Sequence, residues 1–351
     1  MRRFAKIACL ATATAVIAGV GFSSPGFARD LTVVGWGGAY QEAQRKAYFD
    51  PYIKQSGNKL LDESYNGEMA KIKAMVETKN VTWDVVQVEE AEMILGCEEG
   101  LFEPLDWGKI GGKASFLPAA VSECGVGTIY WSIILAYDGD KIKGDGPKTW
   151  ADFFNTAKWP GKRALRKGPK STLEIALMAD GVAPGDVYKV LKTPAGIDRA
   201  FKKLDTIKGD IQWWEAGAQP PQWLAAGDVT LTSAYNGRIT AAAKEGRNFK
   251  IEWDGQIYFI DSWIIVKGSS NVDKSYEFIK LASQPQTQAN LAAEIPYGPT
   301  HVKAAEHSTP AILATLPTAP ANLKNALGSE TSFWVENVEA LSERFNTWAA
   351  Q

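Results

Sequence analysis

Short apolar runs alternate with amphipathic stretches along the first third of the chain. Residues 31–36 and 83–88 are apolar runs of strand length, while residues 43–48 repeat their apolar positions with helical period. We expect the first of these helices to end before Pro51 and a second helix to cover 90–98. Strands that alternate with helices in this way predict α/β units on a largely parallel sheet.

The middle of the chain changes this picture, because residues 127–137 form an apolar run longer than a usual strand. A second α/β pattern follows over 140–260, then an aromatic-rich strand at 258–263 that continues over 262–266, and finally a helical region at 308–351. Two long segments that separate two α/β units predict two lobes joined by a hinge. A cleft between two lobes is a preferred place for a ligand.

Composition supports an exported globular protein of two domains. The chain has 351 residues, and 45% of them are hydrophobic. Residues 1–28 combine Arg2, Arg3 and Lys6 with an apolar stretch and a small-residue cleavage site, which predicts a signal peptide and a periplasmic protein; the alternative is an uncleaved membrane anchor. Its removal takes three cations and no acid, so the formal charge goes from -2 to -5. This mildly acidic balance argues against nucleic acid as a partner.

Two cysteines remain after the predicted cleavage, because Cys9 leaves with the signal peptide. An exported chain with Cys97 and Cys124 favours a disulfide between them, worth about 3 kcal/mol for a loop of roughly 27 residues. The alternative is a pair of buried thiols.

Two charged residues stand out as candidates for binding chemistry. Asp261 lies in an apolar strand whose alternation places Phe259, Asp261 and Trp263 on one face, where a carboxylate among rings suits an ammonium group. Arg238 follows Asn236, which we expect to cap a helix, and a helix N-terminus with a guanidinium suits a carboxylate. The alternative for both residues is an ordinary ion pair within the protein.

Further candidates lie at strand ends. Trp36 and Tyr40 follow the first strand, where glycines would let a ligand approach the backbone; the alternative places Trp36 in the core. Gln87 ends the strand at 83–88, and Trp214 and Tyr297 are additional candidates. No GxSxG, HExxH, CxxC or P-loop pattern occurs, and the two histidines offer no dense ligand cluster. We therefore predict no catalytic site, no metal and no cofactor.

Five motifs give the chain a resemblance to a known family. They are GWGGAY at 35–40, WDVV at 83–86, AYNG at 234–237, FIDS at 259–262 and PYGPT at 296–300. With these motifs the chain resembles the spermidine/putrescine-binding family of periplasmic solute-binding proteins, which serve ABC importers. The resemblance implies a two-lobed α/β fold of type II with two crossover segments. It also implies that rings frame an aliphatic ligand while Asp261 holds an amine. These rings are Trp36, Tyr40, Tyr235, Phe259 and Tyr297.

Arg238 departs from the polyamine pattern, because a diamine has no use for a cation in the cleft. In this respect the chain resembles the GABA (4-aminobutyrate)-binding proteins of plant-associated bacteria. The resemblance implies a monomeric, non-enzymatic receptor for GABA or a related ω-amino acid that delivers it to an inner-membrane permease with its ATPase. The alternatives are a polyamine receptor, an extracytoplasmic lyase or hydrolase, and a ligand sensor that signals through a receptor.

The two long segments also divide the chain into two lobes. We expect lobe 1 to comprise residues 29–137 and 262–310, and lobe 2 to comprise residues 138–261 and 311–351.

Overall fold

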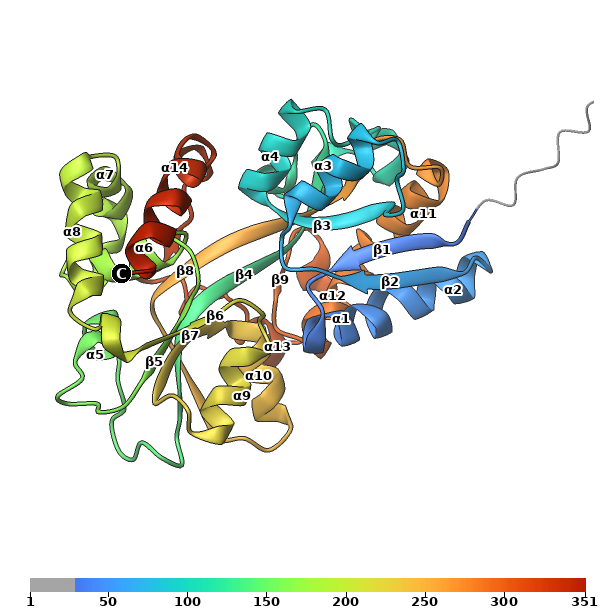
Figure 1. Cartoon of the computed structure of the whole chain (residues 1–351). Coiled ribbons are helices and arrows are strands. Elements are labelled where there is room, and N and C mark those ends of the chain that lie inside the picture. Colours follow the sequence, from blue (N-terminus) through green and yellow to red (C-terminus); the bar gives the residue numbers. More distant parts are fainter. Residues whose placement is uncertain (1–28) are drawn as a thin grey trace, which may run out of the picture.

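A computed structural model describes residues 29–351, so the predicted signal peptide at 1–28 lies outside the described residues. The described chain is a two-lobed α/β fold on a single mixed sheet (Figure 1). The strand order is β2-β1-β3-β8-β4-β7-β5-β6, with β10 (Leu327–Gly328) paired to β8 and β9 (Gly298–Pro299) paired to β4. Within residues 29–351, no helix is both long enough and apolar enough to cross a membrane.

Lobe 1 is built on three parallel strands at one end of the sheet. These strands are β1 (Leu31–Gly35), β2 (Leu60–Ser64) and β3 (Val85–Glu89). Its main helices are α1 (Gly38–Gln44), α2 (Asp50–Ser56), α3 (Met69–Glu77), α4 (Glu90–Glu98), α11 (Val272–Ala282) and α12 (Pro285–Glu294). Helices cover both faces of these strands, as Figure 1 shows, and every residue of β1 and β3 is therefore buried.

Lobe 2 repeats the plan at the other end of the sheet. Its parallel strands are β5 (Arg163–Arg166), β6 (Ile211–Trp214) and β7 (Leu231–Tyr235). Its helices are α5 (Trp150–Phe154), α6 (Thr172–Ala179), α7 (Val187–Leu191), α8 (Pro194–Asp205), α9 (Gln219–Ala226) and α10 (Asn236–Lys244). The sequence pattern had not indicated α7, which is only five residues long.

Two long strands connect the lobes, as the apolar runs predicted. β4 (Gly125–Asp138) and β8 (Phe249–Ile265) pair with each other along almost their full length and run diagonally through the molecule in Figure 1. They pair antiparallel, because the chain leaves lobe 1 along one strand and returns along the other. The expectation of a largely parallel sheet is therefore correct within each lobe and wrong at the junction, where β3–β8 and β4–β7 are antiparallel too. The two strand segments expected at 258–266 are one continuous strand.

The first helical region continues past Pro51, contrary to expectation. A π-helical stretch, Arg45–Phe49, joins α1 to α2, and Pro51 lies in the first turn of α2. The missing amide hydrogen of a proline costs nothing in a first turn, since the amides there have no partner within the helix. The π-helical stretch allows α2 to begin a new first turn while the chain stays helical from α1 to α2.

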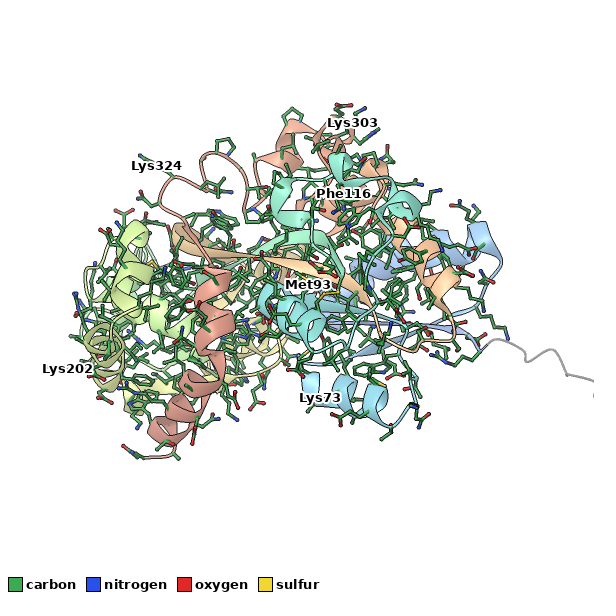
Figure 2. All side chains as sticks on the ribbon, turned by 90° about the horizontal axis from the view of Figure 1, so that it is seen from above. Lys73, Met93, Phe116, Lys202, Lys303 and Lys324 are labelled. Atoms are coloured by element: carbon green, nitrogen blue, oxygen red, sulfur yellow. A yellow bond between two sulfur atoms is a disulfide. The ribbon has the colours of Figure 1, made fainter. Side chains whose placement is uncertain are left out.

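The C-terminal helix α14 (Thr331–Ala349) lies between the helices of lobe 2 and helix α4 of lobe 1. Figures 1 and 2 agree on this position, with Met93 marking α4 in Figure 2. Phe333 packs against Tyr188 of α7, and Trp348 packs against Phe201 of α8. Only α13 (Pro310–Leu313) and α14 are α-helical within the region 308–351, which the sequence had predicted to be helical throughout.

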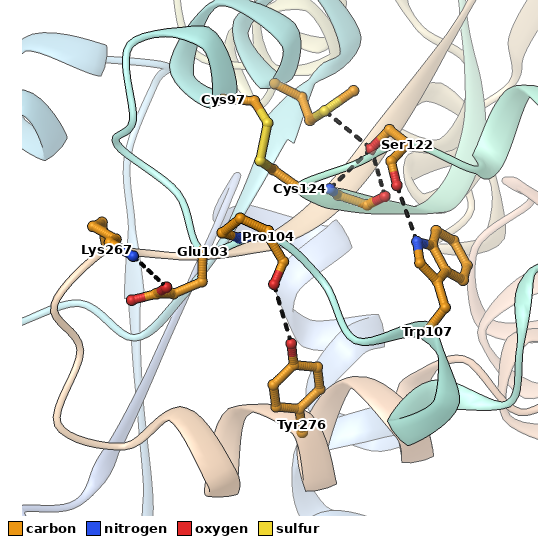
Figure 3. Close-up of a disulfide and its surroundings, with 10 residues drawn as sticks. Cys97, Glu103, Pro104, Trp107, Ser122, Cys124, Lys267 and Tyr276 are labelled. Atoms are coloured by element: carbon orange, nitrogen blue, oxygen red, sulfur yellow. Dashed lines mark hydrogen bonds and ion pairs between the residues drawn. A yellow bond between two sulfur atoms is a disulfide. The ribbon is translucent and has the colours of Figure 1, made fainter.

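The predicted disulfide is present between Cys97 of α4 and Cys124, the residue before β4 (Figure 3). It closes a segment that contains three short 3-10 turns and only isolated β-bridges to its surroundings. The indole of Trp107 donates to the carbonyl of Ser122 at 3.0 Å, and the hydroxyl of Tyr276 donates to the carbonyl of Pro104 at 3.4 Å. A covalent link therefore anchors the segment where backbone pairing is sparse.

Removing this link should destabilise the fold. We expect the double variant Cys97→Ala/Cys124→Ala to lose about 3 kcal/mol of unfolding free energy, because the unfolded chain regains the freedom of a loop of 27 residues. Urea unfolding followed by tryptophan fluorescence measures the loss. Wild type in reductant should unfold at the same urea concentration as the variant, and a variant as stable as the oxidised wild type would contradict the prediction.

Candidate functional site

A small cavity lies where the two lobes meet, at the carboxyl ends of β1, β3 and β7. The empty space inside it, including space open to solvent, is about 280 Å³. The residues that line it are Trp36, Tyr40, Glu89, Ile129, Trp131, Tyr235, Arg238, Asp261 and Tyr297.

Two carboxylates face the cavity from neighbouring strands. Glu89 of β3 and Asp261 of β8 are directly opposed residues of an antiparallel pair, so their side chains leave the sheet on the same face. Asp261 is 2% exposed and accepts hydrogen bonds from the indoles of Trp36 at 2.7 Å and Trp131 at 2.5 Å. Burial raises the pKa of Asp261 well above its usual value, and the charge of Glu89 raises it further, while the two indoles oppose the shift.

Glu89 forms ion pairs with two cations from lobe 2. Arg166, the last residue of β5, donates from Nη2 to Glu89 at 2.8 Å, and Lys170 donates to the other carboxylate oxygen at 2.8 Å. Lys170 also forms an ion pair with Glu92 of α4 at 2.9 Å. Burial alone would raise the pKa of Glu89, but Arg166 and Lys170 lower it to about 2. Glu89 therefore stays charged at neutral pH, in a contact that spans the two lobes.

Arg238, in the first turn of α10, also spans the lobes. Its guanidinium donates to the carbonyls of Gly37 at 2.7 Å and Trp36 at 3.2 Å, and its Nε is buried without a partner. A Cβ at position 38, a glycine with φ of 56°, would lie 2.9 Å from Nη1, so only glycine lets the guanidinium approach this closely. Nε is therefore a buried donor that no acceptor of the described protein uses.

The expected capping role of Asn236 is wrong. Helix α10 begins at Asn236 itself and has no side-chain cap. The Asn236 amide instead donates to the carbonyl of Pro296 at 2.7 Å and accepts from the amide nitrogen of Ser132 at 3.1 Å. These contacts tie α10 to β4 and to the segment that carries Tyr297. A Cβ at Gly237 would lie 2.6 Å from the Tyr297 ring, so that ring packs directly on the helix backbone.

Aromatic rings make up most of the remaining wall. Tyr40 meets Tyr297 edge to face at 5.0 Å between ring centroids, and Trp131 meets Tyr235 in the same way at 5.0 Å. Trp36 is held at the mouth by stacking on Tyr65 at 4.9 Å. Such a wall is apolar towards methylene groups and attractive towards a cation over a ring face.

Three predicted site residues do not line the cavity and support a ring that does. Gln87 donates to the hydroxyl of Tyr40 at 2.7 Å. Phe259 stacks on Trp131 at 4.4 Å, and Trp214 packs edge to face on Tyr235 at 5.0 Å. Trp263, expected on the same face as Asp261, packs against Phe278 at 5.5 Å. The other predicted residues, Trp36, Tyr40, Tyr235, Arg238, Asp261 and Tyr297, all line the cavity.

Sequence reasoning missed Ile129, Trp131, Arg166 and Lys170 as site residues, and it placed Glu89 beside Gln87 at the end of the third strand without giving it a role. Two local signals could have found some of them. Alternation along β4 places Ile129 and Trp131 on one face, and Glu89 lies two residues after Gln87 on β3 and so shares its face. Arg166 ends a parallel strand, as ligand-facing residues often do. No local signal marks Lys170.

Glu174 of α6 is a further buried acid and does not line this cavity. Its Oε1 accepts hydrogen bonds from the hydroxyl of Tyr188 at 2.8 Å and the indole of Trp334 at 3.0 Å, while Oε2 is buried without a partner. Burial raises the pKa of Glu174 from 4.5 to about 7. Its partners lie on α7 and α14, so it belongs to the core of lobe 2. Within the described part of the chain, no cluster of three histidines, cysteines or acids could hold a metal ion.

Comparisons with known proteins agree on one class. A family model described as bacterial extracellular solute-binding protein matches residues 47–321. The gamma-aminobutyric acid-binding protein of Pseudomonas aeruginosa is 53% identical over 92% of this chain and 92% of its own length. A solved ABC transporter substrate-binding protein from Bradyrhizobium japonicum is 39% identical, with a TM-score of 0.83 over 91% of this chain and 99% of its own. A solved GABA receptor is 36% identical, with a TM-score of 0.80 over 92% and 98% of the two chains.

The raised pKa of Glu174 predicts a pH-dependent stability. The folded state binds this proton more tightly than the unfolded chain does, so the stabilisation is fully present below about pH 4.5 and is lost as the pH rises through about 7. Over this range wild type should lose on the order of 3 kcal/mol of unfolding free energy that Glu174→Gln does not lose. Urea unfolding of both proteins at several pH values measures the difference, and parallel profiles would contradict the assignment.

Proposed function

The chain belongs to the family of bacterial extracellular solute-binding proteins, and from this premise we propose that it is a periplasmic receptor for GABA or a closely related ω-amino acid. One observation carries the proposal. Asp261 and Arg238, a carboxylate and a guanidinium, line the same small aromatic cavity. An ω-amino acid has an ammonium group and a carboxylate at the two ends of a short methylene chain, and this cavity offers a counterpart to each part.

In the proposed pose, the Asp261 carboxylate accepts hydrogen bonds from the ligand's ammonium group. The hydrogen bonds that Asp261 accepts from two indoles hold its side chain in place. The unused Nε of Arg238 donates to the ligand's carboxylate. The rings of Tyr40, Tyr235 and Tyr297 contact the methylene groups. Both relatives that are described as GABA-binding support this ligand class.

Delivery to an ABC permease is the finer part of the proposal. Solute-binding proteins of ABC transporters act with a membrane permease, and we propose such a permease and its ATPase as the partners of this chain, which acts as a monomer. The chain would have no enzymatic activity. It would work in the periplasm, after cleavage of residues 1–28.

Closure would follow the hinge formed by β4 and β8. We propose residues 29–137 and 262–310 as one moving unit, and residues 138–261 and 311–351 as the other. Opening would break the bonds from Arg238 to the carbonyls of Trp36 and Gly37 and the ion pairs of Glu89. A ligand that touches both units favours the closed state by its greater affinity for that state.

A polyamine receptor is the second candidate, because Glu89 gives the cavity another acid. Both oxygens of Glu89 are already paired with cations, and Arg238 would repel the distal amine of a diamine. These contacts favour the amino acid over the diamine.

Isothermal titration calorimetry with GABA and putrescine tests the assignment. Wild type should bind GABA more tightly. Arg238→Met should weaken GABA binding by roughly 2–5 kcal/mol and putrescine binding far less, because only GABA has a carboxylate for the guanidinium. Asp261→Asn, which removes the negative charge and keeps an acceptor oxygen for only one of the two indoles, should weaken both ligands.

Thr331→Val serves as the control, because it removes a contact between α14 and Glu90 at 2.6 Å without changing the cavity. Tighter binding of putrescine than of GABA by wild type would refute the assignment. Equal losses for the two ligands in Arg238→Met would show that Arg238 acts on closure and does not meet the carboxylate.

A further inference from the structure

Beyond the identity of the ligand, we propose that Lys170 and Glu89 determine the net charge of the ligand that the closed site accepts. The inference rests on the proposed function. Lys170 acts as a positioning residue that touches no ligand, and together with Glu89 it gives the closed site zero net charge. Such a site selects a zwitterion over a diamine or a dicarboxylate.

The charge balance follows from one group of ion pairs and two further charges beside it. Three charged residues line the cavity: Glu89, Asp261 and Arg238. Glu89 pairs with Arg166 and Lys170, and Lys170 pairs in turn with Glu92. We call these four residues, together with Asp261 and Arg238 of the cavity wall, the charge network. It has three acids and three cations, so its formal charges cancel.

This balance controls selectivity because the site is desolvated. Glu89, Asp261 and Arg238 are each at most 5% exposed, and the side chain of Lys170 is 12% exposed. A ligand with an unmatched charge would leave that charge buried and unpaired, which is strongly unfavourable. A neutral network therefore accepts a ligand whose own charges cancel.

The cations of lobe 2 prevent Glu89 from binding a second amine. Glu89 stands directly opposite Asp261 across β3 and β8, on the same face of the sheet. Without Lys170, its Oε2 would lose the cation now 2.8 Å away and become a free acceptor beside Asp261. A diamine could then pair its second ammonium group with Glu89.

The backbone that carries Lys170 holds it in place. The next residue, Ser171, is buried and has a φ of 67°. This left-handed conformation is unfavourable for any residue other than glycine. Gly168, two residues earlier, has a φ of 128°. Such a loop persists only where surrounding contacts determine it, and here it directs Lys170 across the cleft to Glu89 and Glu92.

The test uses the purified protein, three variants and three ligands of different net charge: putrescine, GABA and glutarate. The network charge is zero in wild type, -1 in Lys170→Gln, +1 in Glu89→Gln and zero again in the double variant. Calorimetry measures the ratios of dissociation constants. Lys170→Gln should shift the ratio of GABA to putrescine by about tenfold or more towards putrescine, and Glu89→Gln should shift the ratio of GABA to glutarate similarly towards glutarate.

The double variant Lys170→Gln/Glu89→Gln should return both ratios to the wild-type values. Thr331→Val, which loosens the contact between lobes without a change of charge, should leave both ratios unchanged. If Lys170→Gln weakened the binding of all three ligands equally, Lys170 would act only in closure of the lobes, and the inference would be overturned. A double variant whose ratios stay at those of either single variant would also overturn it. Absence of GABA binding in wild type would refute the proposed function itself, which keeps the two failures distinct.

Discussion

The closed arrangement depends on the compensation of two carboxylates buried opposite each other. Glu89 and Asp261 are cross-strand neighbours in a site with little access to solvent, where like charges repel strongly. The protein resolves the conflict differently for each acid. Asp261 receives two neutral indole donors, while Glu89 receives two cations from the other lobe. Because the second solution uses groups from lobe 2, the electrostatics of lobe 1 are complete only when the lobes meet.

Local patterns in the sequence pointed to two charged residues that line the candidate cavity. Alternation identified Asp261 on an aromatic strand, and a strand followed by a turn and a helix identified Arg238; both line the cavity. Local patterns did not identify Arg166 and Lys170, because their role depends on a contact with Glu89 of β3, which is 77 and 81 residues away along the chain. Asn236 shows the opposite error, since a good local capping signal lost to tertiary partners on Ser132 and Pro296.

Most of the fold followed from periodicity, and the exceptions have physical causes. The long strands were predicted from their length, but the pairing between them depends on the path of the chain through both lobes. Pro51 was expected to end a helix, and the π-helical stretch before it removes the need. For Trp36 the alternatives of core residue and site residue proved compatible, because Trp36 packs against the core and also lines the cavity.

The two lobes contribute opposite signs of charge to the cleft, and this has a consequence for the capture of a ligand. Glu89 and Glu92 lie on β3 and α4, while Arg166, Lys170 and Arg238 come from β5, the loop after it and α10. When the cleft opens, the neutral network separates into an acidic wall and a basic wall. The field between them would align the dipole of an approaching zwitterion before any contact forms. An encounter in the correct orientation would then be favoured over the reversed one, and the advantage would fade as salt screens the field.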